Sequence, residues 1–215
     1  MVNKILINSL LVCLILFSSC KKDESKPHAN IEWIKIDVPN ASTIHSLSGN
    51  IENELIAGGL SKIFKTSNQG NTWTVVHDGI TAYELRKKED TLFAIALYNH
   101  TYNDYFSLDN GETWQLSPEK SFENLRTNIV TASNGIIYKI LRSETYPKQP
   151  DKVLMSSDGG STWIDIFPYK RYIYTIYLDD DDRLYIGANG WEWNEDINSF
   201  DSSTGNNKGI IYYIK

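Results

Sequence analysis

Three stretches decide the fold: residues 66–73 (TSNQGNTW), 107–114 (SLDNGETW) and 156–163 (SSDGGSTW). They share the pattern Ser/Thr-x-Asp/Asn-x-Gly-x-Thr-Trp, and their tryptophans lie 41 and 49 residues apart. An Asp or Asn side chain in a tight turn accepts hydrogen bonds from backbone N–H groups, and glycine adopts the positive φ that other residues resist. The Thr-Trp pair then opens a strand with a large packing surface. Each stretch therefore predicts a β-hairpin turn with a reinforced tip.

Alternation of apolar and polar residues predicts three more strands around each turn, such as 128–131, 136–140 and 152–155 before the third. The last unit, 172–214, has no room for a fourth strand. Residues 32–36 (EWIKI) match the strands that follow each turn, and Trp33 precedes Trp73 by 40 residues. We therefore expect the N-terminal strand to complete the last sheet, which would also cover an open sheet edge.

The three turns closely resemble the Asp-box, also called the bacterial neuraminidase repeat, which occurs once per blade in β-propellers. The resemblance implies an all-β fold: a four-bladed β-propeller with Asp-box turns, its ring closed by the N-terminal strand. The residues that match the box are Asn68, Gly70, Trp73, Asp109, Gly111, Trp114, Asp158, Gly160 and Trp163. The first box departs mildly, with Thr66 and Asn68 in place of Ser and Asp. We expect a closed monomer; the alternative is an open four-blade array completed by a second chain.

The first 20 residues differ from the rest: a basic Lys4, an apolar run over 5–17, and Ser18-Ser19 before Cys20. This is the pattern of a secretory leader, and the small residues before Cys20 resemble a bacterial lipoprotein signal. Lys21-Lys22-Asp23-Glu24 directly after Cys20 also resembles the acidic export tag of surface lipoproteins in the Bacteroidetes. We predict a signal peptide at 1–19, a tether at 20–30 and a propeller at 31–215. The resemblance implies that Cys20 is lipidated and anchors the protein in the outer membrane of the cell envelope. It is also compatible with exposure at the cell surface. An ordinary secretory signal is the alternative.

Composition excludes several classes of function. The chain has 21 Lys+Arg against 27 Asp+Glu, a formal net charge of −6, which makes nucleic acid a poor partner. Only two cysteines are present, and after loss of Cys13 and lipidation of Cys20 none remains for a disulfide or a catalytic thiol. The four histidines lack metal-ligand spacing, and the acidic run 179–182 is expected to be a solvated hairpin tip. We expect no metal and no cofactor.

In the families that the turns resemble, the face opposite the turns holds the binding site, so the resemblance implies a ligand site in the loops of that face. The longest, 189–208, contains Trp191, Glu192 and Trp193, and shorter loops contain Tyr102 and Tyr146. Aromatic faces beside carboxylates suit sugar rings, which offer C–H faces and hydroxyl edges. The alternative is that both tryptophans pack their loop onto its own sheet.

Three arginines, Arg126, Arg142 and Arg171, are expected near strand ends on the same loop face. Sialidases, whose propellers carry the Asp-box, clamp a substrate carboxylate with three arginines, a task that suits guanidinium forks. Against that comparison, sialidases usually have six blades, their Arg-Ile-Pro segment is absent here, and no Tyr–Glu pair stands out among 13 tyrosines. The alternative for each arginine is an ion-paired strand end.

Together these features predict a tethered, non-catalytic binding module for a glycan or an envelope protein. A sialidase-like glycoside hydrolase and an assembly factor of the Asp-box propeller kind are the alternatives. We do not expect an enzyme.

Overall fold

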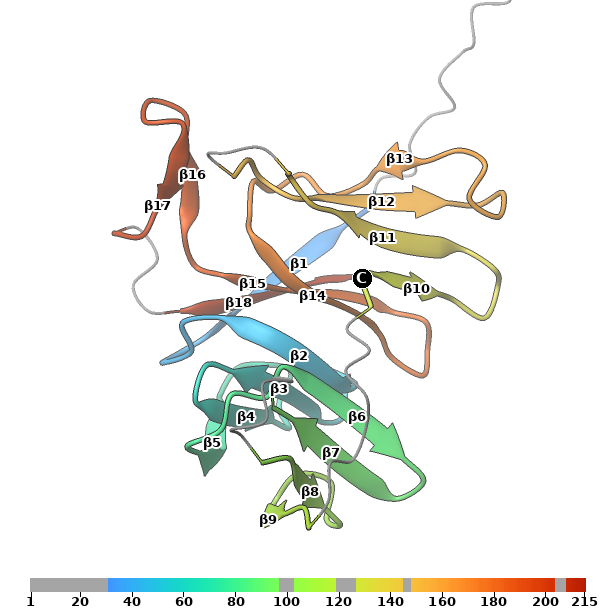
Figure 1. The fold of residues 1–215 in the computed structure, drawn as a ribbon. Coiled ribbons are helices and arrows are strands. Elements are labelled where there is room, and N and C mark those ends of the chain that lie inside the picture. The colour runs from blue at the N-terminus through green and yellow to red at the C-terminus, as the bar shows by residue number, and fades with distance from the viewer. Residues whose placement is uncertain (1–30, 97–102, 119–126, 145–147, 204–207) are drawn as a thin grey trace, which may run out of the picture. The chain divides into compact units, whose positions relative to one another are not determined.

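The computed structural model describes residues 31–96, 103–118, 127–144, 148–203 and 208–215, all within one compact unit spanning 31–215. Every regular element in these ranges is a β-strand (Figure 1). None of the described segments forms a helix that could span a bilayer. The predicted all-β class is confirmed.

Most strands form four-stranded antiparallel sheets, as predicted. Sheet 1 consists of β2 (Ile44–Gly49), β3 (Leu55–Gly59), β4 (Lys62–Thr66) and β5 (Thr74–Asp78). Sheet 2 consists of β6 (Glu84–Lys88), β7 (Thr91–Ile95), β8 (Tyr105–Ser107) and β9 (Gln115–Leu116). Sheet 3 consists of β10 (Ile129–Thr131), β11 (Ile137–Leu141), β12 (Lys152–Ser156) and β13 (Ile164–Asp165).

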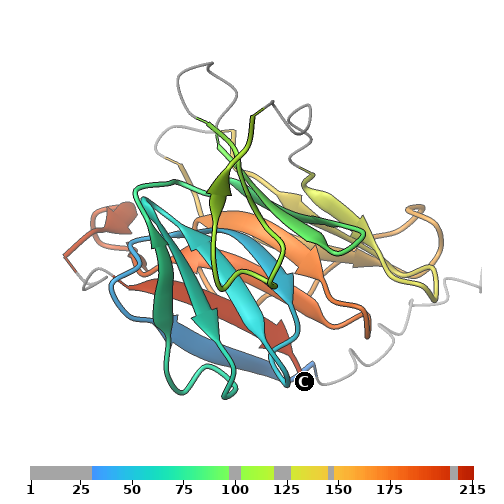
Figure 2. The ribbon, with the colours of Figure 1, turned by 90° about the horizontal axis from the view of Figure 1, so that it is seen from below.

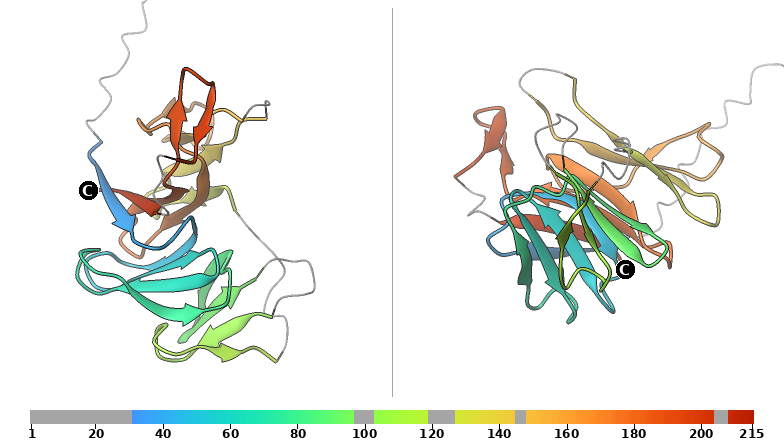
Figure 3. Two further views of the ribbon diagram at one scale, coloured as in Figure 1. Left: turned by 90° about the vertical axis from the view of Figure 1, so that its left-hand side faces the viewer. Right: turned by 60° about the horizontal axis from the view of Figure 1, so that its bottom comes forward.

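Sheet 4 joins the two ends of the described chain. It runs in the order β14 (Ile173–Leu178), β15 (Leu184–Asn189), β18 (Gly209–Ile214) and β1 (Trp33–Val38). β1 pairs antiparallel with β18, from Trp33 opposite Ile214 to Val38 opposite Gly209. The blue β1 lies beside the red β18 in Figures 1, 2 and 3. The predicted completion of the last sheet by the N-terminal strand is confirmed.

The four sheets pack as the blades of a β-propeller, with their first strands innermost. β14 packs against β2 and β10, and β2 also packs against β6. Buried clusters join sheet 3 to sheet 4, sheet 4 to sheet 1, and sheet 1 to sheet 2. A fifth, two-stranded sheet, β16 (Glu192–Asn194) with β17 (Ser199–Asp201), forms a hairpin between β15 and β18.

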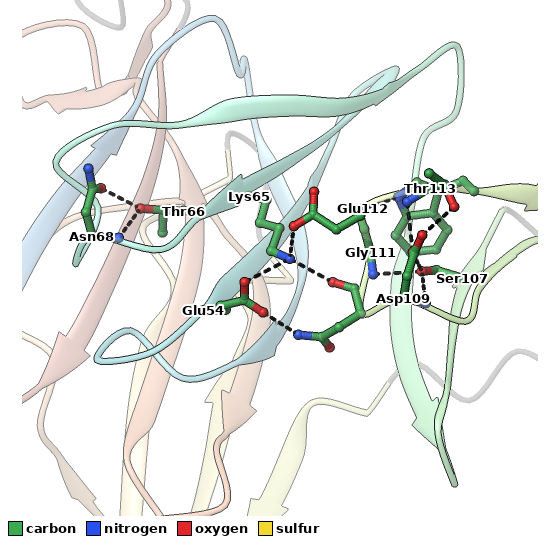
Figure 4. Close-up of polar contacts among 11 residues, drawn as sticks. Glu54, Lys65, Thr66, Asn68, Ser107, Asp109, Gly111, Glu112 and Thr113 are labelled. Atoms are coloured by element: carbon green, nitrogen blue, oxygen red, sulfur yellow. Dashed lines mark hydrogen bonds and ion pairs between the residues drawn. The ribbon is translucent and has the colours of Figure 1, made fainter.

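The turns before β9 and β13 share one hydrogen-bond network (Figure 4 shows that of Asp109). Ser107 Oγ donates to Asp109 Oδ1 over 2.7 Å, while Thr113 donates to the same carboxylate through its N–H (2.9 Å) and its hydroxyl (2.5 Å). Asp158 accepts the same three bonds in sheet 3. Because these donors favour the ionised form, they lower the pKa of Asp109 and of Asp158 to about 2.

The first turn has a similar geometry, with the side-chain amide of Asn68 in place of the carboxylate. Asn68 Oδ1 accepts from Thr66 Oγ1 (3.0 Å) and from Thr72 N (2.9 Å), and its Nδ2 donates to Thr72 Oγ1 over 2.8 Å. The turn therefore depends on an acceptor oxygen at this position, which both Asp and Asn supply. The backbone also reverses here through left-handed residues, such as Gly70 with φ of 80°.

We predict that the double variant Asp109→Asn with Asp158→Asn has a free energy of unfolding that depends less on pH between 4 and 2. A pKa lowered from 3.8 to about 2 stabilises the fold above pH 4, and that stabilisation is lost as the pH falls from 4 towards 2. Denaturant unfolding should show wild type more stable than the variant at pH 7, with the difference shrinking below pH 4. A difference that stays constant down to pH 2 would contradict this account.

We predict that Trp33→Ala destabilises the protein by about 3 kcal/mol, because Trp33 packs edge-on against Phe167 at 5.1 Å and donates from Nε1 to Ile166 O over 2.9 Å. The matched control is Ile34→Ala, the next residue on β1, which joins none of the buried clusters formed by the described residues and should cost about 1 kcal/mol. Urea unfolding measures both. Equal losses would show that Trp33 does not anchor sheet 4 to sheet 3.

Candidate functional site

A cavity of about 380 Å³ lies among the four innermost strands. Its wall includes His45, Tyr83, Glu84, Asn128, Thr131 and Tyr174. All four sheets contribute, because each places its first strand, or the residues that lead into it, at the axis. The volume falls at the lower end of the range for small-molecule sites.

His45 stands between two tyrosines at this cavity. Its ring centroid lies 4.8 Å from that of Tyr83 and 4.6 Å from that of Tyr174. The imidazole is buried, and Nε2 forms a hydrogen bond of 2.8 Å with Thr43 Oγ1. Strands of sheets 1, 2 and 4 thus meet in one aromatic cluster.

The aromatic contacts continue from the cavity to the hairpin β16–β17. Tyr174 contacts Tyr172 at 4.9 Å, Tyr172 contacts Phe200 at 6.3 Å, and Phe200 contacts Trp193 at 5.2 Å. Tyr172 directly precedes β14, and Trp193 is the cross-strand partner of Phe200. We call the series from Trp193 through Phe200, Tyr172 and Tyr174 to His45 the aromatic track.

Ionic and amide contacts fix the hairpin beside the track. Glu192 accepts from Arg171 Nη2 over 3.0 Å, Glu195 pairs with Lys170, and Gln149 donates to Asn198 over 3.3 Å. Lys148 Nζ donates to the Tyr172 hydroxyl over 3.1 Å and lies 5.0 Å from the centre of its ring. Figure 3 shows the hairpin projecting beyond β15 and β18.

Two polar side chains, one of them at the axial cavity, carry buried atoms without a hydrogen-bond partner among the described residues. Glu84 pairs with Arg86 through Oε1, while its Oε2 has no partner. Asn189, which forms a backbone bridge with Thr43, is fully buried, and both atoms of its amide lack one. Buried polar atoms of this kind are uncommon and suit contact with a polar ligand or solvent.

The predicted tryptophans differ in their surroundings. Trp191 is 42% exposed, whereas Trp193 is partly buried against Phe200. Glu192, which lies between them in the sequence, forms an ion pair with Arg171. Tyr102, Tyr146 and Arg126 lie outside the described residues.

The structure brings Arg142 and Arg171 to the same junction, between sheets 3 and 4. Arg142 donates to Ile173 O (2.5 Å) and lies 3.5 Å from Asp151, a carboxylate whose pKa is raised by burial. Arg171 donates to the hydroxyl of Tyr212 (2.8 Å) as well as to Glu192. Both guanidiniums therefore engage acceptors of the protein itself, at strand ends.

Sequence reasoning did not select Tyr83, Tyr172, Tyr174 and Phe200 as site residues. The available signal was the Tyr-x-Tyr spacing of 172 and 174 at the start of an innermost strand. Among the described residues no group of three or more His, Cys, Asp or Glu could hold a metal ion.

No protein-family model matches the chain, and no curated protein matches it. Solved structures similar to it include a protein of unknown function from Bacteroides thetaiotaomicron (11% identity, 85% of this chain and 76% of that one, TM-score 0.37). YCF48 from Cyanidioschyzon merolae is similar at 16% identity (81% and 76%, TM-score 0.33). A GH74 enzyme from Niastella koreensis is similar at 17% identity and TM-score 0.31, with 79% of this chain matching only 28% of the enzyme. At these identities and TM-scores, none of them bears on what the chain binds.

Proposed function

We propose that this protein is a non-catalytic binding module, tethered to the cell envelope, whose ligand is a glycan. The observation that carries the proposal is the aromatic track, which joins the hairpin β16–β17 to the axial cavity. The propeller supplies a rigid support, since the track begins on a hairpin and ends on innermost strands.

The chemistry of the track suits sugar rings. Tyr and Trp combine an apolar ring with a polar atom, so they cover the C–H face of a sugar and also bond its hydroxyls. Lys148 and Gln149 supply polar groups beside Tyr172 and the hairpin. The cavity, walled by His45, Tyr83 and Tyr174, has room for one end of such a ligand.

The carboxylates near the track support binding rather than hydrolysis. A glycosidase of the common kind needs two carboxylates about 5 to 10 Å apart across the scissile bond. Glu192, Glu195 and Glu84 are each paired with a cation of the protein. Arg142 and Arg171 are likewise engaged, which weighs against a sialidase-type clamp.

The repeated turns and the N-terminal sequence complete the proposal. We infer that the turns at Asn68, Asp109 and Asp158 are Asp-boxes of the sialidase-type propellers, because each uses one acceptor side chain to hold the Thr two residues beyond its Gly. Lipidation of Cys20 would anchor the protein to the outer membrane, as several acyl chains on one residue bind a bilayer firmly.

We predict that Tyr172→Ala and Trp193→Ala each weaken retention on an array of defined oligosaccharides by about tenfold or more, since each removes one stacking platform (~1.4 kcal/mol per tenfold). Leu108→Ala removes a 65% exposed apolar side chain at the second turn and is the matched control. Trp191→Ala tests whether the exposed tryptophan outside the aromatic track also contributes to binding. Absence of glycan binding by the wild type would refute the glycan ligand, and pull-down from native membranes would then test an assembly role.

We predict that Cys20→Ser moves the protein from the membrane fraction to the soluble fraction and abolishes labelling with a fatty-acid analogue. Cys13→Ser is the matched control and should keep both properties, because it lies in the predicted leader. Retained membrane association of Cys20→Ser without label would show that the anchor is not a lipid on this residue.

A further inference from the structure

The charge of the axial cavity comes from a single carboxylate. Among the described residues that line the cavity, Glu84 is the one carboxylic acid, and none is a lysine or an arginine. Glu84 is the first residue of β6, the innermost strand of sheet 2. The chain as a whole has a formal net charge of −6. The electrostatic field at the cavity therefore favours a cation over an anion.

The two oxygens of this carboxylate differ in their surroundings. Arg86, two residues further along β6, donates to Glu84 Oε1 from Nε over 2.8 Å and also from Nη2. Oε2 is buried and has no hydrogen-bond partner in the described part of the chain. A buried acceptor without a donor is costly, and a charged donor compensates for that cost better than a neutral one. The last torsion of a glutamate is soft, so a small rotation presents Oε2 to a donor in the cavity.

Aromatic rings form another part of the cavity wall. His45 lies between Tyr83 and Tyr174, with ring centroids 4.8 Å and 4.6 Å away. Tyr83 directly precedes Glu84 in the chain, so ring and carboxylate reach the cavity from one segment. Tyrosine rings attract cations and also cover the C–H face of a sugar. A carboxylate beside such rings suits an ammonium group carried by a sugar.

Sheet 3 adds neutral polar groups to the wall. Asn128 and Thr131 both line the cavity. Asn128 accepts from Arg142 through Oδ1 over 3.0 Å, which leaves its amide nitrogen, a donor, turned away from that arginine. An amide donor and a threonine hydroxyl suit sugar hydroxyl groups, because these both donate and accept.

We propose that the axial cavity binds an amino sugar through its primary ammonium group, with Glu84 as the anionic partner. The inference rests on the proposed glycan function and names the class of sugar that enters the cavity. The ammonium group donates to Glu84 Oε2, the sugar ring lies against the tyrosines, and its hydroxyl groups meet Asn128 and Thr131. The volume of about 380 Å³ is sufficient for one monosaccharide.

Arg86 opposes binding at this site. Its guanidinium shares the carboxylate with the ligand, and two positive charges on one carboxylate repel each other. Loss of the negative charge of Glu84 and loss of the positive charge of Arg86 should therefore change the affinity for an ammonium ligand in opposite directions.

The test compares three sugars that share one ring and differ at C2. Glucosamine carries an ammonium group there, N-acetylglucosamine an acetamide and glucose a hydroxyl. Ligand-observed NMR titration of the full chain measures Kd at pH 7, where an amine with a pKa of about 8 is mostly protonated. We expect glucosamine to bind at least about tenfold more tightly than either of the other sugars, since a hydrogen bond between two charged groups is the stronger kind.

Three variants locate the site. Glu84→Gln should remove the preference for glucosamine. Glu32→Gln is the matched control: it removes the same charge from a residue that pairs with Lys215 outside the cavity, and it should keep the preference. Arg86→Met should raise the affinity for glucosamine by about threefold or more. A gain of affinity cannot arise from misfolding, so this variant remains informative even if Glu84→Gln does not fold.

The outcomes separate this proposal from the glycan function on which it rests. Equal binding of the three sugars, or a preference that persists in Glu84→Gln, would overturn the amino-sugar site and leave glycan binding by the aromatic track intact. Undetectable binding of glucosamine would overturn it as well. Glucosamine binding that depends on Glu84, with no oligosaccharide retained on the array, would support the cavity site and overturn the track.

A fourth ligand tests whether the sugar ring is required. Butylammonium carries the charge without the ring, and it should bind at least about tenfold more weakly than glucosamine, because it lacks the contacts with the tyrosines and with Asn128 and Thr131. Binding as tight as that of glucosamine would overturn the assignment to a sugar.

Discussion

The structure depends on the pairing of β1 with β18. This ladder brings residues 33–38 to the outer edge of the sheet that contains residues 209–214, so the first described strand completes the last sheet. Without β1 the edge of β18 would be open and Trp33 could not reach Phe167, which follows β13 of sheet 3. The position of sheet 4 against sheet 3 in turn sets Arg171, Tyr172 and the hairpin that follows β15, from which the aromatic track begins.

The repeated turns contribute a second, local constraint. Each ties its own hairpin through one side-chain acceptor, and two of them also abut the preceding sheet through a glycine that leaves no room for a Cβ. The first turn shows that the hairpin can form without the charge, because Asn68 Oδ1 accepts from Thr66 and Thr72 N, while its Nδ2 donates to the Thr72 hydroxyl that donates to the carboxylate in the other two turns. It also differs in its tryptophan: the buried indole N–H of Trp73 has no hydrogen-bond partner in the described part of the chain, whereas those of Trp114 and Trp163 donate to a glycine carbonyl.

Much of the fold could be predicted from the sequence, because the information is local. The turn pattern, the alternation of the strands and the resemblance of residues 32–36 to the other outer strands led to the observed sheets and to β1 in the last one. The candidate site was harder to predict from the sequence. Trp193 was selected from its aromatic and acidic neighbours, but Glu192 turned out to pair with Arg171, and the partner rings Tyr172 and Phe200 come from segments 28 residues apart. A single sequence gives no signal for such contacts.

The sequence by itself determined the reinforced turns, the number of strands around each and the strand that completes sheet 4, since hydrogen bonding within a hairpin and the alternation of faces act over a few residues. Only the tertiary structure decided which side chains share a surface. His45, Tyr83 and Tyr174 meet because three sheets place their innermost strands around one axis. Arg142 and Arg171 engage carbonyls, carboxylates and a tyrosine hydroxyl because the junction between sheets 3 and 4 brings those acceptors within reach. Packing between sheets, which no local pattern encodes, therefore separates the residues that join neighbouring sheets from those that line the axial cavity.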